Sequence, residues 1–269
     1  ASRSGNEPVA MSHENTIHDQ FSRQAVPFSE ARSMADADAI QLLMDAAQAA
    51  PGHRSLDVAC GPGLVALAFA AVVREAVGLD TTPAMLDRAR VLQSQRGTTN
   101  VEWILGDAAC LPFPDASFEI VTCRFAIHHM LEPVATLIEM NRVVRPGGRI
   151  VVCDAVASTD PSKAQAFNDF ERMRDPSTVR FLTAAELRAL FAQAGLQIEA
   201  ERTYQVPTEL EALLKTSFPA PGDTAKLRDI AAASLASDEI GMATHRHCSR
   251  IHMSYPAVIL SAQAVQKTR

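Results

Sequence analysis

Short apolar runs ending near glycine or aspartate alternate along the chain with longer segments that have the character of buried helices. Four of the short runs are β-capable, and they cover residues 55–59, 75–79, 101–105 and 118–123. Residues 35–50 place apolar side chains at helical spacing, and residues 64–73 form an apolar run that suits a helix against a sheet. The 269 residues are therefore predicted to form one large α/β domain, or at most two small ones.

The N-terminal segment has no such pattern. Residues 1–14 are polar and aperiodic, which predicts a flexible tail. Residues 15–35 contain scattered apolar side chains, among them Phe21 and Phe28, and predict a helical arm. This arm either covers a pocket or simply caps the core. It would open the main domain, which spans residues 15–269.

The first predicted strand leads into a glycine turn. Residues 55–63 read Ser-Leu-Asp-Val-Ala-Cys-Gly-Pro-Gly, and a strand, glycine turn and helix form the usual nucleotide loop. Residues 61–66 even satisfy the dinucleotide fingerprint. Asp57 argues against that ligand, because a carboxylate at the turn would repel a pyrophosphate. It would attract an ammonium or sulfonium group, which favours S-adenosylmethionine over a nicotinamide dinucleotide.

Acidic residues also follow the next two strands. Asp80 lies 19 residues beyond Gly61, where a carboxylate can accept from both hydroxyls of a ribose. Asp107 could accept from an adenine amino group, and the Ala108 amide could address a ring nitrogen. A single Gly-Asp pair in a loop is usually only a turn. Because Asp57, Asp80 and Asp107 repeat at successive strand ends, they predict a binding site.

Composition narrows the class of partner. The net charge is −6 and no run is rich in Lys or Arg, which argues against nucleic acid. Five cysteines form no C-x-x-C pair, so we expect no metal or redox site and a reduced, cytoplasmic setting. No apolar run reaches the ~18 residues of a membrane span. We therefore expect a small-molecule partner, without nucleic acid or membrane, and the oligomeric state stays open.

Five motifs in sequential order resemble those of class I S-adenosylmethionine-dependent methyltransferases, above all the ubiquinone/menaquinone C-methyltransferase branch of small-molecule enzymes. They cover residues 57–63, 77–80, 106–108, 111–118 and 142–148. The resemblance implies a Rossmann-like three-layer α/β sandwich. Its seven-stranded, mostly parallel sheet would have the order 3-2-1-4-5-7-6, with the last strand antiparallel. The last three strands would be residues 149–154, about 196–203 and about 257–262.

The resemblance also implies where the cofactor, S-adenosylmethionine, and its product S-adenosylhomocysteine would bind. The predicted contacts are Asp57, Ala59, Cys60, Gly61, Gly63, Asp80, Thr81, Met85, Gly106, Asp107, Ala108, Arg124 and Phe125. Met85 would pack on the adenine, although by itself it is an ordinary core residue. Arg124 would offer its backbone carbonyl to the cofactor's ammonium group. Residues 205–250, between the last two strands, would form a lid over the acceptor pocket.

The candidate catalytic residues, His128 and His129, follow the fourth strand, whose carboxyl end faces the ligand crevice of an open α/β sheet. A histidine could remove a proton from a hydroxyl, an acidic carbon or an ammonium, or it could merely cap a helix. His129 is preferred because its spacing from Arg124 resembles the catalytic histidine of phosphoethanolamine N-methyltransferases. Those enzymes pair it with an N-terminal tyrosine, which this arm lacks, so their substrate is not expected.

The remaining candidates concern the methyl acceptor. Phe21, Phe28 and Asp154 are predicted to bind it, although Asp154 could equally bond the following loop. His245 and His247 are expected to be surface or core residues and not metal ligands.

The sequence favours methyl transfer to an oxygen, carbon or nitrogen of a small metabolite. The first alternative is a protein of the same fold without methyl transfer, as in a binding protein or pericyclase. The second is a nicotinamide-dependent oxidoreductase.

Overall fold

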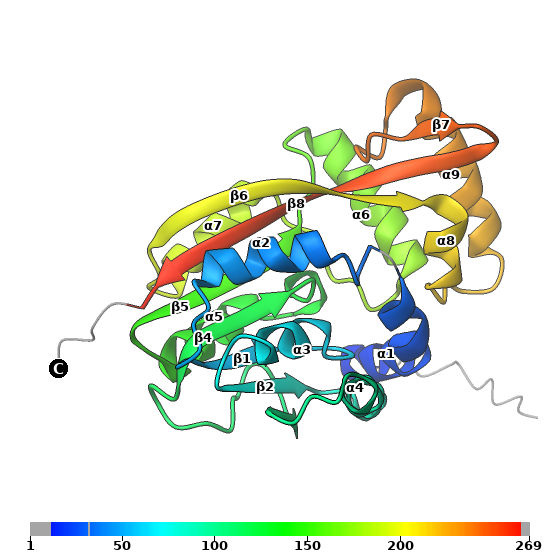
Figure 1. Ribbon diagram of the computed structural model, residues 1–269. Coiled ribbons are helices and arrows are strands. Elements are labelled where there is room, and N and C mark those ends of the chain that lie inside the picture. The colour runs from blue at the N-terminus through cyan, green and yellow to red at the C-terminus, as the bar shows by residue number, and fades with distance from the viewer. Residues whose placement is uncertain (1–11, 32, 265–269) are drawn as a thin grey trace, which may run out of the picture.

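The four strands that the apolar pattern predicts lie between residues 54 and 124, and helices follow the first two of them. The computed structural model describes residues 12–31 and 33–264 (Figure 1). The helices are α1 (His13–Glu30), α2 (Ala37–Ala47), α3 (Leu64–Ala70), α4 (Pro83–Arg96), the 3₁₀ turn η1 (Ile127–His129), α5 (Pro133–Val143), α6 (Pro161–Arg174), α7 (Ala184–Gln193), α8 (Leu210–Lys215) and α9 (Asp223–Ser237). The strands are β1 (Arg54–Val58), β2 (Glu75–Asp80), β3 (Val101–Leu105), β4 (Phe118–Arg124), β5 (Val144–Ala155), β6 (Ile198–Glu209), β7 (His245–His247) and β8 (Arg250–Gln263).

The sheet has the order β3-β2-β1-β4-β5-β8-β6. Strands β1 to β5 pair in parallel, and β8 runs antiparallel to both β5 and β6. The predicted order is confirmed, with β8 in the place of the predicted seventh strand. The short strand β7 pairs with β8 outside this path and was not predicted, so the described sheet has eight strands.

The boundaries of the late strands were predicted too narrowly. β5 begins at Val144, β6 continues to Glu209, and β8 begins at Arg250. The extensions of β6 and β8 pair with each other well beyond β5. Most of β6 is exposed and carries no apolar run, so its length left no signal in the sequence.

Helices cover both faces of the sheet and complete the predicted three layers (Figure 1). On one face α2 and α3 pack on the sheet through a buried cluster that includes Leu43, Phe69 and Ile120. On the other face α5 and α7 pack through Leu137, Phe191 and their neighbours. Both faces of the central strands are thereby buried, and only the carboxyl edge of β1, β2 and β4 is left for a ligand.

A third cluster lies apart from the sheet layers, at the far ends of β6 and β8. It joins α6, α8 and α9 through buried side chains such as Phe167, Phe170 and Leu227. We call α6, α8, α9, β7 and the adjoining ends of β6 and β8 the cap (Figure 1). Most of the predicted lid, residues 205–250, lies in the cap. Its first residues continue strand β6, and α6 joins it from an earlier part of the chain.

The N-terminal arm is a single helix of 18 residues that begins before residue 15 and ends before residue 35, the two bounds of the predicted arm. It begins at His13 with Ser12 as its N-cap, so residues 12–14 do not belong to a tail, and residues 1–11 lie outside the described residues. Pro27 lies in the last turn, so the hydrogen bond that its missing amide donor removes is near the end of the helix. Arg88 of α4 donates to Ser29 at 2.7 Å, which fixes the end of α1 beside α4.

Candidate active site

Strand β1 carries a buried carboxyl group just before the glycine turn. Asp57 is 3% exposed, and its Oδ1 accepts from the Thr122 hydroxyl at 2.8 Å. Burial raises the pKa of Asp57 to about 7, because the charged form is poorly solvated there. Among the described residues no cation lies within hydrogen-bond distance of this carboxyl. A ligand that brings positive charge would restore the ionised form.

Asp80, at the end of β2, holds the same turn from the other side. Its two carboxylate oxygens accept from the amides of Gly61 and Thr82, each at 2.8 Å. Burial raises the pKa of Asp80 as well. Gly61 and Phe125, which follows β4, both have a φ of 52°. Residues other than glycine rarely adopt this backbone conformation, so Phe125 is strained.

Gly63 packs against an aromatic ring. It does not line the cavity beside the turn, and a Cβ atom at Gly63 would lie 2.3 Å from Cη2 of Trp103. A Cβ atom at Gly78 of β2 would meet the same ring at 2.5 Å. The two glycines therefore make room for the Trp103 ring, which the sequence alone did not reveal.

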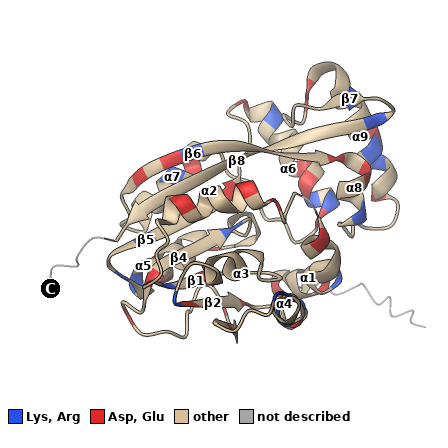
Figure 2. Ribbon diagram, viewed as in Figure 1, with Lys and Arg blue, Asp and Glu red and all other residues tan. Residues whose placement is uncertain are grey.

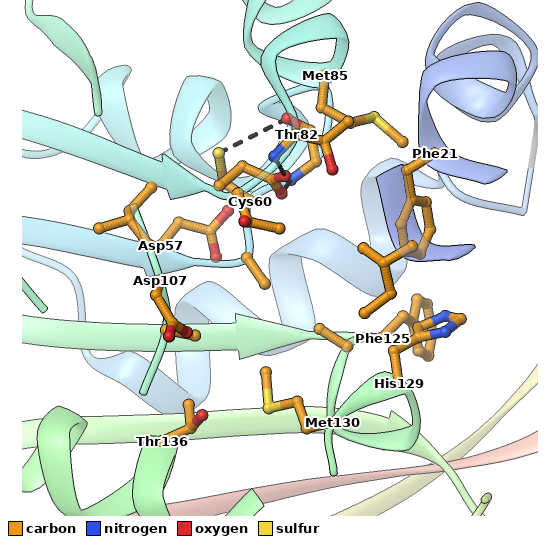
Figure 3. A pocket seen from close by; sticks show the side chains of 18 of the residues that line it. Phe21, Asp57, Cys60, Thr82, Met85, Asp107, Phe125, His129, Met130 and Thr136 are labelled. Atoms are coloured by element: carbon orange, nitrogen blue, oxygen red, sulfur yellow. Dashed lines mark hydrogen bonds between the residues drawn. The ribbon is translucent and has the colours of Figure 1, made fainter. Parts of the chain in front are cut away.

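A cavity of about 440 Å³ lies at the carboxyl edge of β1, β2 and β4. Every predicted cofactor residue except Gly63 lines it, including the three acids Asp57, Asp80 and Asp107. Figure 3 shows Phe21 of α1 and His129 on one side of this cavity and Asp57 on the other. The sequence did not predict the contributions of Thr82, Met130, Leu131, Thr136 and, from α1, His13 and Ile17.

A second cavity of about 90 Å³ adjoins the first. Phe21, Phe28, Phe125 and His129 line both cavities and so form their common wall. The other walls come from α1, the loop after α6, and the cap, where Val206, Thr208, Leu213 and Thr216 belong to the predicted lid. A molecule in the second cavity would reach the first at this aromatic junction.

His129 stands at the junction. Its Nδ1 lies 3.1 Å from both the carbonyl oxygen and the hydroxyl of Ser177. Phe21 meets the ring edge-on, with centroids 4.8 Å apart. Burial, together with the neighbouring His128, lowers the pKa of His129 to about 3. The imidazole is therefore neutral near pH 7, with a lone pair on one nitrogen.

His128 lines the second cavity only. Its Nδ1 lies 2.7 Å from Oδ1 of Asp154, and its amide donates to the other carboxylate oxygen at 3.1 Å. The ring stacks on Phe181, with centroids 4.0 Å apart. Asp154 lines neither cavity, contrary to its prediction as an acceptor contact, because both of its oxygens are held by His128 and the amide of Ala155.

Two other predicted features have structural roles. The Arg124 guanidinium donates to the Met34 carbonyl at 2.9 Å and packs over Phe125 at 4.5 Å. His245 and His247 are exposed on β7. Within the described ranges, no group of three His, Cys, Asp or Glu side chains could hold a metal ion, and no helix is long and apolar enough to cross a membrane.

Comparison with known proteins identifies the family. A family model described as a methyltransferase domain matches residues 56–152. The uncharacterized methyltransferase YcgJ of Bacillus subtilis is 33% identical over 219 residues, which cover 81% of this chain and 86% of YcgJ. The chain belongs to the class I S-adenosylmethionine-dependent methyltransferases. The crystal structure of YcgJ matches this methyltransferase with a TM-score of 0.78 and 29% identity, over 85% of this chain and 99% of that one.

A second relative of the methyltransferase is the demethylmenaquinone methyltransferase of Mycobacterium sp. (strain KMS). The two are 36% identical over 167 residues, which cover 58% of this chain and 70% of the relative. The cofactor of the methyltransferase is S-adenosylmethionine, as predicted. The alternative of a nicotinamide-dependent oxidoreductase is therefore wrong.

The first cavity fits this cofactor. Its volume of about 440 Å³ lies within the usual range for small-molecule sites, roughly 300–1,000 Å³. Asp57 is a buried carboxyl group whose ionised form a cation would stabilise, and the cofactor carries an ammonium group. Gly61, without a side chain, lets the ligand approach the backbone closely.

Proposed function

We propose that the methyltransferase methylates an oxygen or an acidic carbon of a small molecule held in the second cavity, with His129 as the general base. The observation that carries this proposal is the position of His129 on the wall shared by the two cavities. A neutral imidazole in that place can take a proton from the acceptor at the point where the methyl group arrives.

The first cavity offers a distinct partner for each part of the cofactor. Asp57 would hold the ammonium group, and Asp80 would accept from the ribose hydroxyls. Asp107 and the Ala108 amide would address the adenine. Bound S-adenosylmethionine supplies an activated methyl group on a sulfonium that becomes a neutral thioether on transfer. These contacts would fix the methyl group at the aromatic junction.

The aromatic junction orients the acceptor and excludes water. Phe21 and Phe28 belong to α1, and Phe125 follows β4. Side chains from separate parts of the fold therefore enclose the junction. Reaction in such an enclosed site depends chiefly on alignment and on the absence of water. The proton taken up by His129 would replace the positive charge that the site loses on methyl transfer.

The charge distribution supports a small-molecule acceptor. Figure 2 shows acidic and basic segments interleaved on β6 and the cap helices. A nucleic acid would call for concentrated positive charge. The Mycobacterium relative is named for demethylmenaquinone, also a small molecule.

The proposal is tested with S-adenosylmethionine carrying a trideuterated methyl group and a panel of phenols, hydroquinones, β-keto acids and amines. Mass spectrometry should detect the label on an oxygen or a carbon. His129→Asn keeps a donor where Nδ1 stands and removes Nε2, so turnover should fall by about 10²–10⁴-fold. S-adenosylhomocysteine affinity should stay within a few-fold of wild type.

The matched control is His247→Asn, because His247 is exposed on β7 far along the chain from the site. It should turn over like the wild type. Label found on amines alone, or full turnover in His129→Asn, would overturn the proposal.

A further inference from the structure

A chain of buried polar groups lies behind His129, on the side away from the first cavity's acids. His129 Nδ1 is 3.1 Å from the Ser177 hydroxyl, which lies 2.5 Å from Oδ1 of Asp175. Gln24 of α1 donates to the other Asp175 oxygen at 2.8 Å. Ser177 is fully buried and Asp175 is 2% exposed, and both Asp175 and Gln24 line the second cavity.

The hydrogen positions in this chain follow from what each atom can do. The Ser177 carbonyl can only accept, so the Nδ1 atom 3.1 Å away must carry the proton. The Ser177 hydroxyl donates to Asp175, which leaves its oxygen free to accept from the same Nδ1–H. Both contacts thus place the proton on Nδ1. The lone pair of the neutral ring is then on Nε2.

The Ser177 backbone amide also donates to Oδ1 of Asp175 at 3.0 Å, so the described hydrogen bonds to this carboxylate come from Ser177 and Gln24. The adjacent Arg174 is engaged by Glu171, with contacts of 2.9 and 2.6 Å, and by Ser217. Tyr255 also donates to Glu171. No described group lies within hydrogen-bond distance of His129 Nε2. The neighbouring His128 contacts a different carboxylate, that of Asp154.

We propose that the carbonyl and hydroxyl of Ser177, with Asp175 as the acceptor of that hydroxyl's proton, keep His129 in the Nδ1–H form, so that its Nε2 accepts the acceptor's proton. Ser177 and Asp175 are thus positioning residues. The inference rests on the proposed role of His129 as the base. The acceptor's O–H or C–H bond breaks, an N–H bond forms at Nε2, and the imidazolium then carries both protons. Asp175 stays a carboxylate and stabilises that cation through Ser177, without taking a proton itself.

This series of hydrogen-bonded groups also connects the N-terminal helix α1 to the site. Because Gln24 belongs to α1, the hydrogen bond to Asp175 forms only while α1 lies over the site. His13 of the same helix lies 2.7 Å from the His129 carbonyl. The seated helix therefore orders both His129 and the carboxylate behind it.

Nuclear magnetic resonance of protein labelled with ¹⁵N-histidine tests the inference without an acceptor. The His129 signals are assigned by their loss in His129→Asn, and the Nδ1–H form should predominate in the wild type. In Asp175→Asn the new amide can donate to Ser177, whose hydroxyl is then free to donate to Nδ1. The Nε2–H form should therefore rise. In Ser177→Ala the carbonyl remains and the Nδ1–H form should persist.

The matched control is Asp169→Asn, on the exposed side of α6, which should leave the tautomer unchanged. With the acceptor found by the labelled-methyl screen, Asp175→Asn should lower kcat by about 10- to 100-fold with little change in KM, part of the general-base contribution. An unchanged tautomer in a folded Asp175→Asn, or unchanged kcat, would overturn the inference. Failure of the proposed function itself looks different, because His129→Asn would then keep full turnover.

Discussion

At the scale of single residues, the site contains two carboxyl groups, Asp57 and Asp80, that burial has made costly to ionise. Asp57 is the clearest of them, since its pKa is raised to about 7 by burial. A buried acid of this kind is stable when protonated and becomes a strong partner for a cation once ionised. Its protonation should therefore be linked to cofactor binding.

S-adenosylhomocysteine is expected to bind more tightly as the pH rises from about 5 to 7. Below the raised pKa of Asp57 the free protein holds a proton there, and the ligand's ammonium group favours the ionised form. Binding must then release that proton, and affinity should rise by up to about tenfold per pH unit. Calorimetry in buffers of different ionisation enthalpy measures the release.

Asp57→Asn should bind more weakly and lose this pH dependence. Asp87→Asn is the control, because Asp87 is an exposed residue of α4. Equal proton release in wild type and Asp57→Asn would show that another group is responsible.

The sequence predicted the residues whose place follows from strand ends. Asp57, Asp80 and Asp107 come together because parallel strands bring their carboxyl ends to one edge. Ser177 and Asp175 were missed, since they lie in a loop with no periodicity, 48 and 46 residues after His129 in the chain. Only the tertiary fold shows what a polar loop residue contacts.

At the scale of elements, two parts of the chain differ from their predicted roles. The N-terminal arm is a full helix whose buried face includes the polar side chains Gln20 and Gln24 as well as aromatic ones. Because polar and apolar side chains are mixed on this face, the predicted bounds of the arm differ from those of the helix. The glycine turn serves α3 as much as the ligand, because Gly63 is the N-cap of α3 and lies against Trp103.

Gly63→Ala should destabilise the protein more than Gly97→Ala. Both glycines have a positive φ, 80° and 64°, so alanine at either position costs about 1–2 kcal/mol. Only at Gly63 would the new Cβ meet a ring, and such overpacking adds about 1–3 kcal/mol. Urea unfolding at constant pH compares the two variants. Equal losses of unfolding free energy would mean that the Trp103 ring moves aside freely.

At the scale of the whole molecule, the two cavities share an aromatic wall, and their other walls come from different parts of the fold. The first cavity is framed by β1, β2 and β4, whereas the second cavity has walls from the cap. The strand order was predictable because each central strand is a short apolar run. The cap was only outlined, since its strands are exposed and its helices come from two separate parts of the chain.

Phe170→Ala should therefore impair methyl transfer more than cofactor binding. Phe170 is fully buried in the cap, and its truncation costs about 3–5 kcal/mol of local packing. Acceptor KM should rise while S-adenosylhomocysteine affinity stays near wild type. Phe69→Ala, a similar truncation beneath the cofactor turn, should weaken cofactor binding as well. Equal loss of cofactor affinity in both variants would contradict this separation.

The ring that Gly63 and Gly78 accommodate has a practical consequence. Trp103 is the only tryptophan in the 269 residues, and its indole donates to Gln93 at 2.7 Å. All tryptophan emission from the protein thus originates directly behind the cofactor turn. Trp103 fluorescence can therefore serve as an intrinsic probe of the turn at which the ligand approaches the backbone.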